Sequence, residues 1–291
     1  MAQAVRQDAT IHFGQTVIKV VSRMEDWPIG CVNVTTASGD AFLFDELVFT
    51  APLGWLKQHQ ASTFQPPLPA RLVSAIDSIG YGCLEKVYIS FPDAFWKRPD
   101  ATTGRVVRGF CQWLAPGVYA QPSNPEHWPH EAVDLSTMPA STAHPTLLFY
   151  TFGAQSRHIT DTLEALRANA DKTDTTDTAQ NNFLINYFRP YFSRLPHYDA
   201  VEPACQPVAC LATSWLHDDL AGNGSYSNFQ VGLEAGDEDV RTMREGLPDR
   251  GLWLAGEHTA PFVALGTATG AHWSGESVGR RIAESYGRQR E

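Results

Sequence analysis

The 291-residue sequence lacks the features that mark several whole classes of protein. Its five cysteines include no C-x-x-C pair and no group with histidine at zinc-ligand spacing, so neither a disulfide scaffold nor a metal site is expected. No apolar run reaches the ~18 residues that a membrane-spanning helix needs, and the N-terminal residues lack the apolar stretch of a secretory signal. These absences favour a soluble, intracellular protein with no membrane partner.

The sequence also has fewer basic residues than acidic residues. The 22 lysines and arginines stand against 32 aspartates and glutamates, which gives a formal net charge of −10. A nucleic-acid-binding surface needs a basic patch to contact phosphates, so the composition excludes a general nucleic-acid binder. Hydrophobic residues make up 43% of the chain, which is ample for a buried core.

The first 60 residues have the β-branched and aromatic content of strands. The last apolar run, 46–51, shows no alternation and predicts a strand covered on both faces. Pro52 can then open a short helix, because proline fits a first helical position. The expected strands are 16–21, 31–38, 41–44 and 46–51.

The middle of the chain mixes helices and strands. Six prolines between residues 115 and 146 predict a long surface excursion without regular structure. The segment 105–114 is expected to be the neighbour of the strand 84–91. The other expected elements are helices at 69–79, 155–169 and 181–194, with a polar break at 171–180, and strands at 146–153 and 207–215.

The end of the chain predicts one strand at 252–255 and one helix at 267–286. Strands, then a mixed middle, then a last strand and helix suit an α/β (mixed α+β) fold in which one domain, built from both ends of the chain, is interrupted by a second.

The C-terminal segment is the first candidate for chemistry. The strand ends at Gly256 and Glu257, and small residues, including Gly270, lie in the first turns of the helix. A helix N-terminus has unpaired N–H groups and a partial positive charge, which suits an electron-rich oxygen or a ring that becomes anionic. The alternative is a helix packed tightly against a sheet, since small residues also serve packing.

Lys86 is the second candidate. Alternation along its strand places it on one face with Leu84 and Tyr88, while Glu85 and Val87 point the other way. A lysine in this position can line a cavity. The alternative is a lysine that protects an exposed strand edge.

Tyr226 lies in a glycine-rich loop, where it can cover a ligand or simply pack on the surface. His258 and His272 have no carboxylate or cysteine partner at ligand spacing. Both are therefore expected to be hydrogen-bonded structural histidines, not metal ligands.

Four segments of the sequence resemble, in order and spacing, the flavin-containing amine oxidase superfamily, nearest to its polyamine oxidase and lysine-specific histone demethylase branch. They extend over nearly the whole chain, and chance does not readily produce four such blocks in register. The segments are LVFTAPLGWLKQ (47–58), AIDSIGYGCLEKVYISFPDAFW (75–96), GSYS (224–227) and WLAGEHTAPFVALGTATGAHWSGESVGRRIAE (253–284).

The resemblance implies roles beside the substrate. Lys86 falls on the lysine that holds a water next to the hydride-accepting nitrogen of the flavin. Tyr226 falls on an aromatic residue that faces the flavin across the substrate cavity. Leu220 lies near the position where relatives often have a tryptophan beside the flavin, and this departure affects the shape of the cavity.

The resemblance also implies the cofactor contacts. Glu257 falls on the acid that hydrogen-bonds the ribityl chain, and Thr267 with Ala268 lies where helix N–H groups meet the pyrimidine edge of the flavin. Val17 matches the strand valine whose backbone meets the adenine. No cysteine follows Cys210, so the covalent flavin link of monoamine oxidases is absent and FAD is expected to bind non-covalently.

The family further implies domains and chemistry. Residues 1–60 and 249–291 would form part of a Rossmann-like FAD-binding domain, and residues 61–248 an amine-substrate domain built on a mixed sheet with flanking helices. The expected reaction is hydride transfer from the α-carbon of an amine to flavin, with molecular oxygen as the second substrate and an imine and hydrogen peroxide as products. The acidic composition favours a cationic substrate such as a polyamine, and secondary-metabolite amines and amino acids are the alternatives.

The G-x-G-x-x-G fingerprint of dinucleotide-binding members is missing from the sequence. The only G-x-G pairs begin at Gly80 and Gly222, and their third positions hold Glu85 and Ser227. Three explanations stay open: a chain truncated relative to the family, a partner chain that supplies the missing half, or a relative that has lost catalysis. The alternative function is accordingly a catalytically inactive remnant or interaction module.

Overall fold

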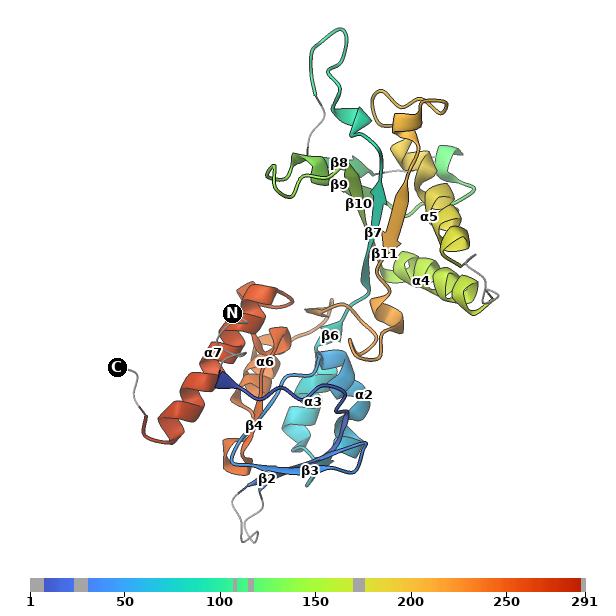
Figure 1. Cartoon of the computed structure of the whole chain (residues 1–291). Helices are drawn as coiled ribbons and strands as arrows, with labels where there is room; N and C mark the ends of the chain where they lie inside the picture. The colour runs from blue at the N-terminus through green and yellow to red at the C-terminus, as the bar shows by residue number, and fades with distance from the viewer. Residues whose placement is uncertain (1–7, 24–30, 107–108, 115–117, 170–175, 289–291) are drawn as a thin grey trace. The chain divides into compact units, whose positions relative to one another are not determined.

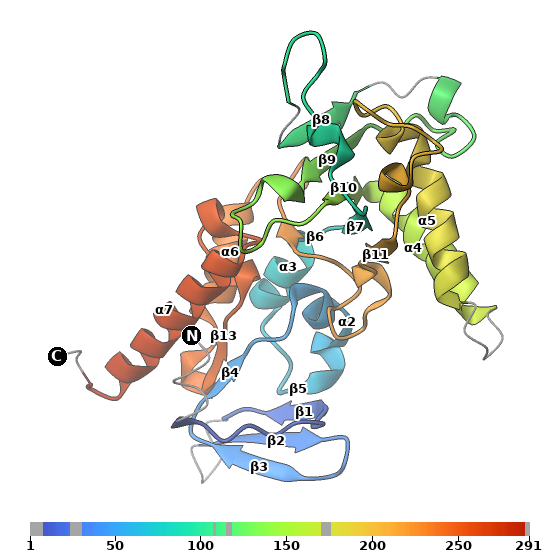
Figure 2. The ribbon, with the colours of Figure 1, turned by 45° about the horizontal axis from the view of Figure 1, so that its top comes forward.

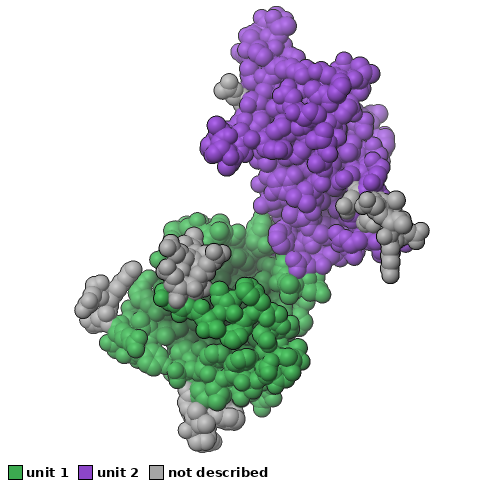
Figure 3. Space-filling model, viewed as in Figure 1, with its two compact units in different colours: residues 1–81, 219–291 green, residues 82–218 purple. Residues whose placement is uncertain are grey.

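The computed structural model describes residues 8–23, 31–106, 109–114, 118–169 and 176–288. The chain forms two compact units, coloured separately in Figure 3: unit 1 is Met1–Tyr81 with Asp219–Glu291, and unit 2 is Gly82–Asp218. Both ends of the chain therefore contribute to one unit, as the predicted fold class requires. The units divide the chain after Tyr81 and Asp218, whereas the sequence suggests boundaries after residues 60 and 248.

Unit 1 contains a mixed four-stranded sheet in the order β3-β2-β1-β5. Figure 2 shows β1, β2 and β3 together as one layer of this unit. Strands β2 and β3 are antiparallel neighbours, and β1 pairs with β5 in parallel. The strands are β1 (Val17–Val21), β2 (Val32–Thr36), β3 (Ala41–Phe44) and β5 (Phe64–Gln65).

A second sheet of unit 1 consists of two parallel strands, one from the N-terminal part of the chain and one from the C-terminal part. Strand β4 (Leu47–Phe49) pairs with β13 (Leu252–Leu254), and Val48 lies opposite Trp253. All three residues of β13 are buried. The expectation that 46–51 is covered on both faces is wrong for the described chain, because Val48 on β4 is 38% exposed.

Among the described residues of unit 1, the structure has the helices α2 (Leu53–Thr63), α3 (Ala70–Ser78), α6 (Gly236–Glu245) and α7 (Ala268–Ser285). Their apolar faces and the strands form one core that includes Leu53, Ile76 and Leu252. Helix α6 is an addition to the predicted elements. Its apolar signal is weak, since Val240 and Met243 are its buried hydrophobic residues, and Asp239 ties it to Arg71 of α3 at 2.7 Å. A short antiparallel pair, β6 (Gly80–Tyr81) with β12 (Ser227–Asn228), is also present.

Unit 2 is built on a five-stranded antiparallel sheet in the order β11-β7-β10-β9-β8. Helices α4 (Gly153–Ala168) and α5 (Thr176–Phe192) pack on this sheet (Figure 1). Val87, Phe149 and Phe188 are fully buried in the core between them. The strands are β7 (Leu84–Ser90), β8 (Phe110–Trp113), β9 (His130–Asp134), β10 (Thr146–Phe152) and β11 (Ala209–Ala212).

The structure corrects three expectations for unit 2. Strand β8 pairs with β9 and is not the neighbour of β7, because β10 and β9 lie between them. The proline-rich segment 115–146 contains β9 and is therefore not devoid of regular structure. The polar break predicted at 171–180 begins outside the described residues, and its last residues belong to α5.

Short 3₁₀ turns connect these elements. They are η1 (Phe95–Lys97), η2 (Val118–Ala120), η3 (Leu135–Thr137), η4 (Pro203–Cys205), η5 (Trp215–His217), η6 (Pro248–Arg250), η7 (Glu257–Thr259) and η8 (Phe262–Ala264). Among the described residues, no helix is both long enough and apolar enough to cross a membrane.

Candidate functional site

In unit 1 the candidate site begins where β13 ends. Gly256 has φ 153°, and a Cβ atom there would lie 2.6 Å from Cε1 of His258, so the position requires glycine. Its N–H donates to Oγ of Ser274 at 3.0 Å, and Ser274 also hydrogen-bonds Thr259 at 2.6 Å. These contacts fix the turn that presents Glu257 against helix α7.

The Glu257 carboxylate is the centre of a hydrogen-bonded cluster. It accepts from the Ser227 hydroxyl at 2.8 Å, from the Ser227 backbone N–H at 3.2 Å and from the Gly266 backbone N–H at 2.9 Å. Burial raises the pKa of Glu257, although the donors from Ser227 and Gly266 act in the opposite direction. Three donors on two oxygens leave acceptor capacity for a further hydroxyl group.

Helix α7 starts immediately beside this carboxylate. Thr267 is the N-cap, and its side-chain oxygen accepts the Gly270 N–H at 2.9 Å. The N–H groups of Ala268 and Thr269 have no partner within the helix, as in any first turn, and both residues are exposed. The predicted helix N-terminus is therefore present, with its partial positive charge accessible.

Tyr226 packs against the same turn. A Cβ atom on Gly266 would lie 2.8 Å from Cδ2 of the Tyr226 ring, so glycine is needed for this close approach. The tyrosine is half-buried. The structure thus brings together three predicted site residues, Tyr226, Glu257 and Thr267. With Ser227 and Gly266 they form what we call the Glu257 cluster.

The glycine-rich loop that carries Tyr226 is held on helix α2. A Cβ atom on Gly54 would lie 2.0 Å from the Gly222 carbonyl oxygen, so the two backbones touch directly. Tyr81 donates its hydroxyl to the Ala221 carbonyl at 2.7 Å, which fixes the loop from a second side. The side chain of Leu220 is 85% exposed.

Val17 lies in the same unit, at the start of β1. It pairs with Thr36 beside an irregularity in the strand and packs on the core of unit 1. Within the described part of the chain, no hydrogen bond or ring contact joins Val17 to the Glu257 cluster. Its role at the adenine stays a prediction.

Lys86 lies on an interior strand of the sheet of unit 2. Strand β7 has β11 on one side and β10 on the other, so a lysine guarding a sheet edge is excluded. The predicted alternation is confirmed: Glu85, Val87 and Ile89 are buried, and the intervening side chains are half-buried. The Lys86 ammonium lies 6.0 Å from the ring centre of Tyr150, its partner on β10.

Lys86 belongs to a sheet face that α4 and α5 do not cover, and we call it the open face. The side chains on this face form rows that run across neighbouring strands. One row is polar, and the adjacent row is largely apolar. The polar row is Lys86, Tyr150, Glu131 and Gln112, and the apolar row is Leu211, Tyr88, Leu148, Val133 and Phe110.

Sequence reasoning assigned no role to Glu85, which is fully buried behind Lys86. Its carboxylate accepts from the Thr213 hydroxyl at 2.5 Å and from the Leu216 N–H at 3.1 Å. Thr213 in turn accepts the Lys86 backbone N–H at 2.9 Å. The signal was present in the alternation, because a carboxylate on a core-facing position must find donors inside the protein.

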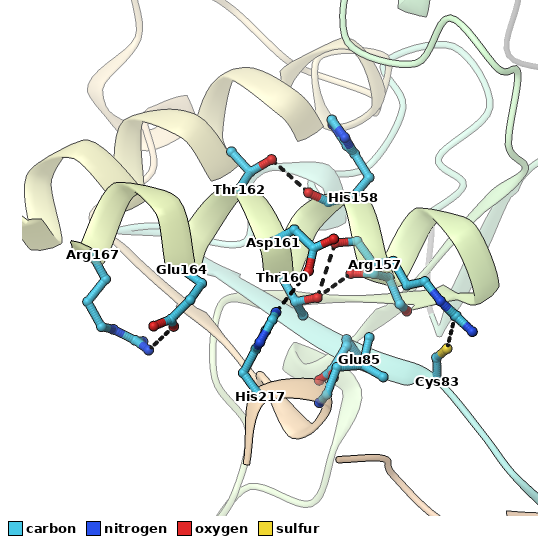
Figure 4. Close-up of polar contacts among 12 residues, drawn as sticks. Cys83, Glu85, Arg157, His158, Thr160, Asp161, Thr162, Glu164, Arg167 and His217 are labelled. Carbon is cyan, nitrogen blue, oxygen red and sulfur yellow. Dashed lines mark hydrogen bonds and ion pairs between the residues drawn. The ribbon is translucent and has the colours of Figure 1, made fainter. Parts of the chain in front are cut away.

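The turn that binds Glu85 is itself attached to helix α4 (Figure 4). His217 of η5 lies 2.9 Å from Asp161 of α4, and Arg157 donates to the sulfur of Cys83 at 3.0 Å, just before β7. Lys86 is therefore positioned by a network that includes both the sheet and the helix packed on it.

The two histidines, His258 and His272, have different surroundings. No group of three metal-ligating side chains is found among the residues that the structure describes. His272 is exposed and lies 3.7 Å from Glu276. His258 is buried, but the expectation of a hydrogen bond is wrong for its Nε2, which has no partner in the described chain. Burial lowers the pKa of His258 to about 4, so it is neutral at pH 7.

Comparison with known proteins identifies the family to which this chain belongs. Residues 1–283 match the family model for flavin containing amine oxidoreductases, so the chain belongs to this family. The recognised resemblance to the polyamine oxidase and histone demethylase branch is confirmed by the relatives.

Three relatives illustrate the match. The human peroxisomal N(1)-acetyl-spermine/spermidine oxidase is 27% identical over 86% of this chain and 44% of its own length. Polyamine oxidase 2 of Arabidopsis thaliana is 27% identical over 95% of this chain and 46% of its own. Lysine-specific histone demethylase 1 homolog 2 of Oryza sativa subsp. japonica is 29% identical over 83% of this chain and 26% of its own. The chain thus spans less than half the length of each of these relatives.

Family membership assigns the chain a flavin cofactor, FAD, held without a covalent bond. The Glu257 cluster fits such a group. It offers a carboxylate with spare acceptor capacity, unpaired N–H groups at the start of α7 and glycines that allow close approach to the backbone.

Proposed function

We propose that this protein acts as an amine oxidoreductase in which the Glu257 cluster helps to hold FAD and Lys86 serves the redox step. The observation that carries the proposal is the Glu257 cluster itself, because Tyr226, Glu257 and Thr267, distant in sequence, lie together in unit 1.

When bound, FAD would supply the redox chemistry, namely oxidation of a neutral amine at its α-carbon to an imine, with molecular oxygen as the final electron acceptor and hydrogen peroxide as its product. Water would then hydrolyse the imine to a carbonyl compound. The protein's own contribution is position and charge. Glu257 would accept a hydrogen bond from a ribityl hydroxyl, and the N–H groups of Ala268 and Thr269 would face the electron-rich edge of the ring. The positive end of α7 stabilises negative charge that develops there.

Lys86 would hold a water molecule beside the reacting ring nitrogen. The backbone of Lys86 is fixed through Thr213 and Glu85, while its ammonium group stays on the open face. A fixed backbone with an accessible ammonium group suits a residue that orients a water without binding the substrate covalently.

We further propose that the amine is a cationic polyamine. One of the relatives is a polyamine oxidase and another is an N(1)-acetyl-spermine/spermidine oxidase. The formal net charge of −10 also favours a cationic substrate. The pyrophosphate of FAD would be held by a G-x-G-x-x-G segment outside this sequence, either on the same polypeptide or on a second chain, because neither G-x-G pair here has the required third glycine.

The proposal is tested by flavin binding and anaerobic reduction. The protein is purified, supplied with FAD, and where needed with a separately expressed G-x-G-x-x-G half, and then mixed with spermidine without oxygen. We expect the flavin absorbance to bleach on mixing and hydrogen peroxide to appear when air is admitted. A protein that retains no flavin under these conditions, or whose bound flavin is not reduced by any amine, would instead support the catalytically inactive alternative.

A further inference from the structure

Glu131 of β9 lies in the same polar row of the open face as Lys86. The strand register places Tyr150 between them, opposite Lys86 on one side and opposite Glu131 on the other. Side chains directly opposite each other in an antiparallel sheet share a face. Because neighbouring strands lie ~4.8 Å apart, the backbones at Lys86 and Glu131 are separated by roughly 10 Å.

The Glu131 carboxylate differs from the other acidic side chains of this sheet. Glu85 and Asp134 face the helices and accept hydrogen bonds from Thr213 and Ser136, respectively. Glu131 is half-buried on the open face, and in the described part of the chain its carboxylate makes neither a hydrogen bond nor an ion pair. A half-buried carboxylate without an internal partner is available for a cationic ligand.

The surroundings of Glu131 favour an alkyl ammonium group over a metal ion. The adjacent row is largely apolar, and two of its members, Phe110 and Leu211, are 51% and 65% exposed. An alkyl chain can lie along this row and remove apolar surface from water. The ring of Tyr150, beside Glu131, offers an additional surface to a cation.

The positive charge of Lys86 determines which end of the row a cation prefers. Its ammonium group leans toward Tyr150, 6.0 Å from the ring centre, and repels a second positive charge at that end. A cationic group therefore gains most on the far side of Tyr150, where Glu131 lies.

We propose that Glu131 binds a protonated ammonium group of the substrate, distant from the carbon that is oxidised, and so selects amines with a second positive charge. The inference rests on the proposed amine oxidoreductase function and names the residue that determines specificity within it. Glu131 is a binding residue and takes no part in hydride transfer.

The test compares Glu131→Gln with the unchanged protein, using spermidine and a linear alkylamine of similar length that has one amino group. Glutamine keeps the shape and removes the charge. We expect the ratio of kcat/KM for spermidine to that for the alkylamine to fall by about 10- to 100-fold, the worth of a hydrogen bond to a charged group, with the change residing in the dissociation constant of spermidine. Glu126→Gln, which removes an exposed carboxylate outside the sheet, is the matched control and should leave the ratio as it is.

An unchanged ratio in Glu131→Gln, or an equal loss for both amines, would contradict the assignment of Glu131. Failure of the proposed function has a different signature, namely no flavin reduction by either amine in the unchanged protein. In that case calorimetric titration with spermidine tests the binding role of Glu131 without catalysis. Binding that Glu131→Gln weakens about tenfold or more supports the assignment. Equal or undetectable binding in both proteins overturns it.

Discussion

At the scale of single residues, the carboxylates of Glu85 and Glu257 differ in what they leave free for a ligand. Glu85 is satisfied by Thr213 and Leu216 and determines where the backbone of Lys86 lies. Glu257 is also hydrogen-bonded, yet it retains acceptor capacity toward the start of α7. The family resemblance predicts roles for Lys86 and Glu257. The alternation along β7 marks Glu85 as facing the core, but its donors Thr213 and Leu216 cannot be read from the sequence.

The first prediction concerns Lys86. Replacing it by methionine should slow flavin reduction by spermidine about tenfold or more, because the water it orients is lost, while the flavin content changes little. Stopped-flow absorbance measures the reduction rate, and the flavin spectrum of the denatured protein measures the content. Lys19→Met, at an exposed position on β1, is the control. Equal reduction rates in the Lys86→Met and unchanged proteins would remove Lys86 from the mechanism.

The second prediction concerns His130, which is buried in unit 2 next to Gln155 and Tyr191. Burial lowers its pKa to about 3, from an ordinary value of 6.5. A histidine with a depressed folded-state pKa contributes stability above its unfolded pKa and loses that contribution as the pH falls. Between pH 7 and pH 5, His130 should therefore cost the folded state about 2 kcal/mol.

Urea denaturation at both pH values measures this effect. His130→Gln should lose about 2 kcal/mol less on acidification than the unchanged protein, whereas His12→Gln, at an exposed position, should behave as the unchanged protein does. An identical pH dependence in all three proteins would show that His130 is not held neutral by burial.

At the scale of elements, strong apolar patterns predicted the structure and mixed patterns did not. Strand β10 and helix α7 agree with the sequence to within a few residues. Strand β9 escaped detection because two of its buried positions hold His130 and Asp134, so that no apolar alternation marks the strand. The local sequence pattern also does not reveal the order of strands in a sheet. For this reason β8 was assigned the wrong neighbour.

Helix α7 offers a prediction with an internal control. A Cβ atom on Gly270 would lie 2.0 Å from the Ala264 carbonyl oxygen, whereas one on Gly275 would meet nothing within 4 Å. We expect Gly270→Ala to lower the free energy of unfolding by about 1–3 kcal/mol, because the turn before the helix must move. Gly275→Ala should raise it by up to about 1 kcal/mol through helix propensity.

Thermal or urea denaturation of the two variants tests this packing. If Gly270→Ala is as stable as Gly275→Ala, the close approach of α7 to the turn at Ala264 is incorrect, and the Glu257 cluster that depends on this turn would be placed wrongly as well.

At the scale of the whole molecule, the arrangement of the chain shows how the Glu257 cluster of unit 1 is assembled from distant segments. Strand β4, near the start, pairs with β13, near the end, and Tyr226 from a third segment packs on Gly266. Unit 2 is inserted between these segments and carries Lys86 and Glu131 on one face of its own sheet.

The most direct test is a crystal structure of the protein with FAD bound, together with the G-x-G-x-x-G half where that is a separate chain. We predict the flavin ring at the N-terminus of α7, a ribityl hydroxyl hydrogen-bonded to Glu257, and the Lys86 ammonium joined to the ring nitrogen through one water. A flavin bound away from Glu257, or a Lys86 ammonium too distant for a single bridging water, would contradict the central claim.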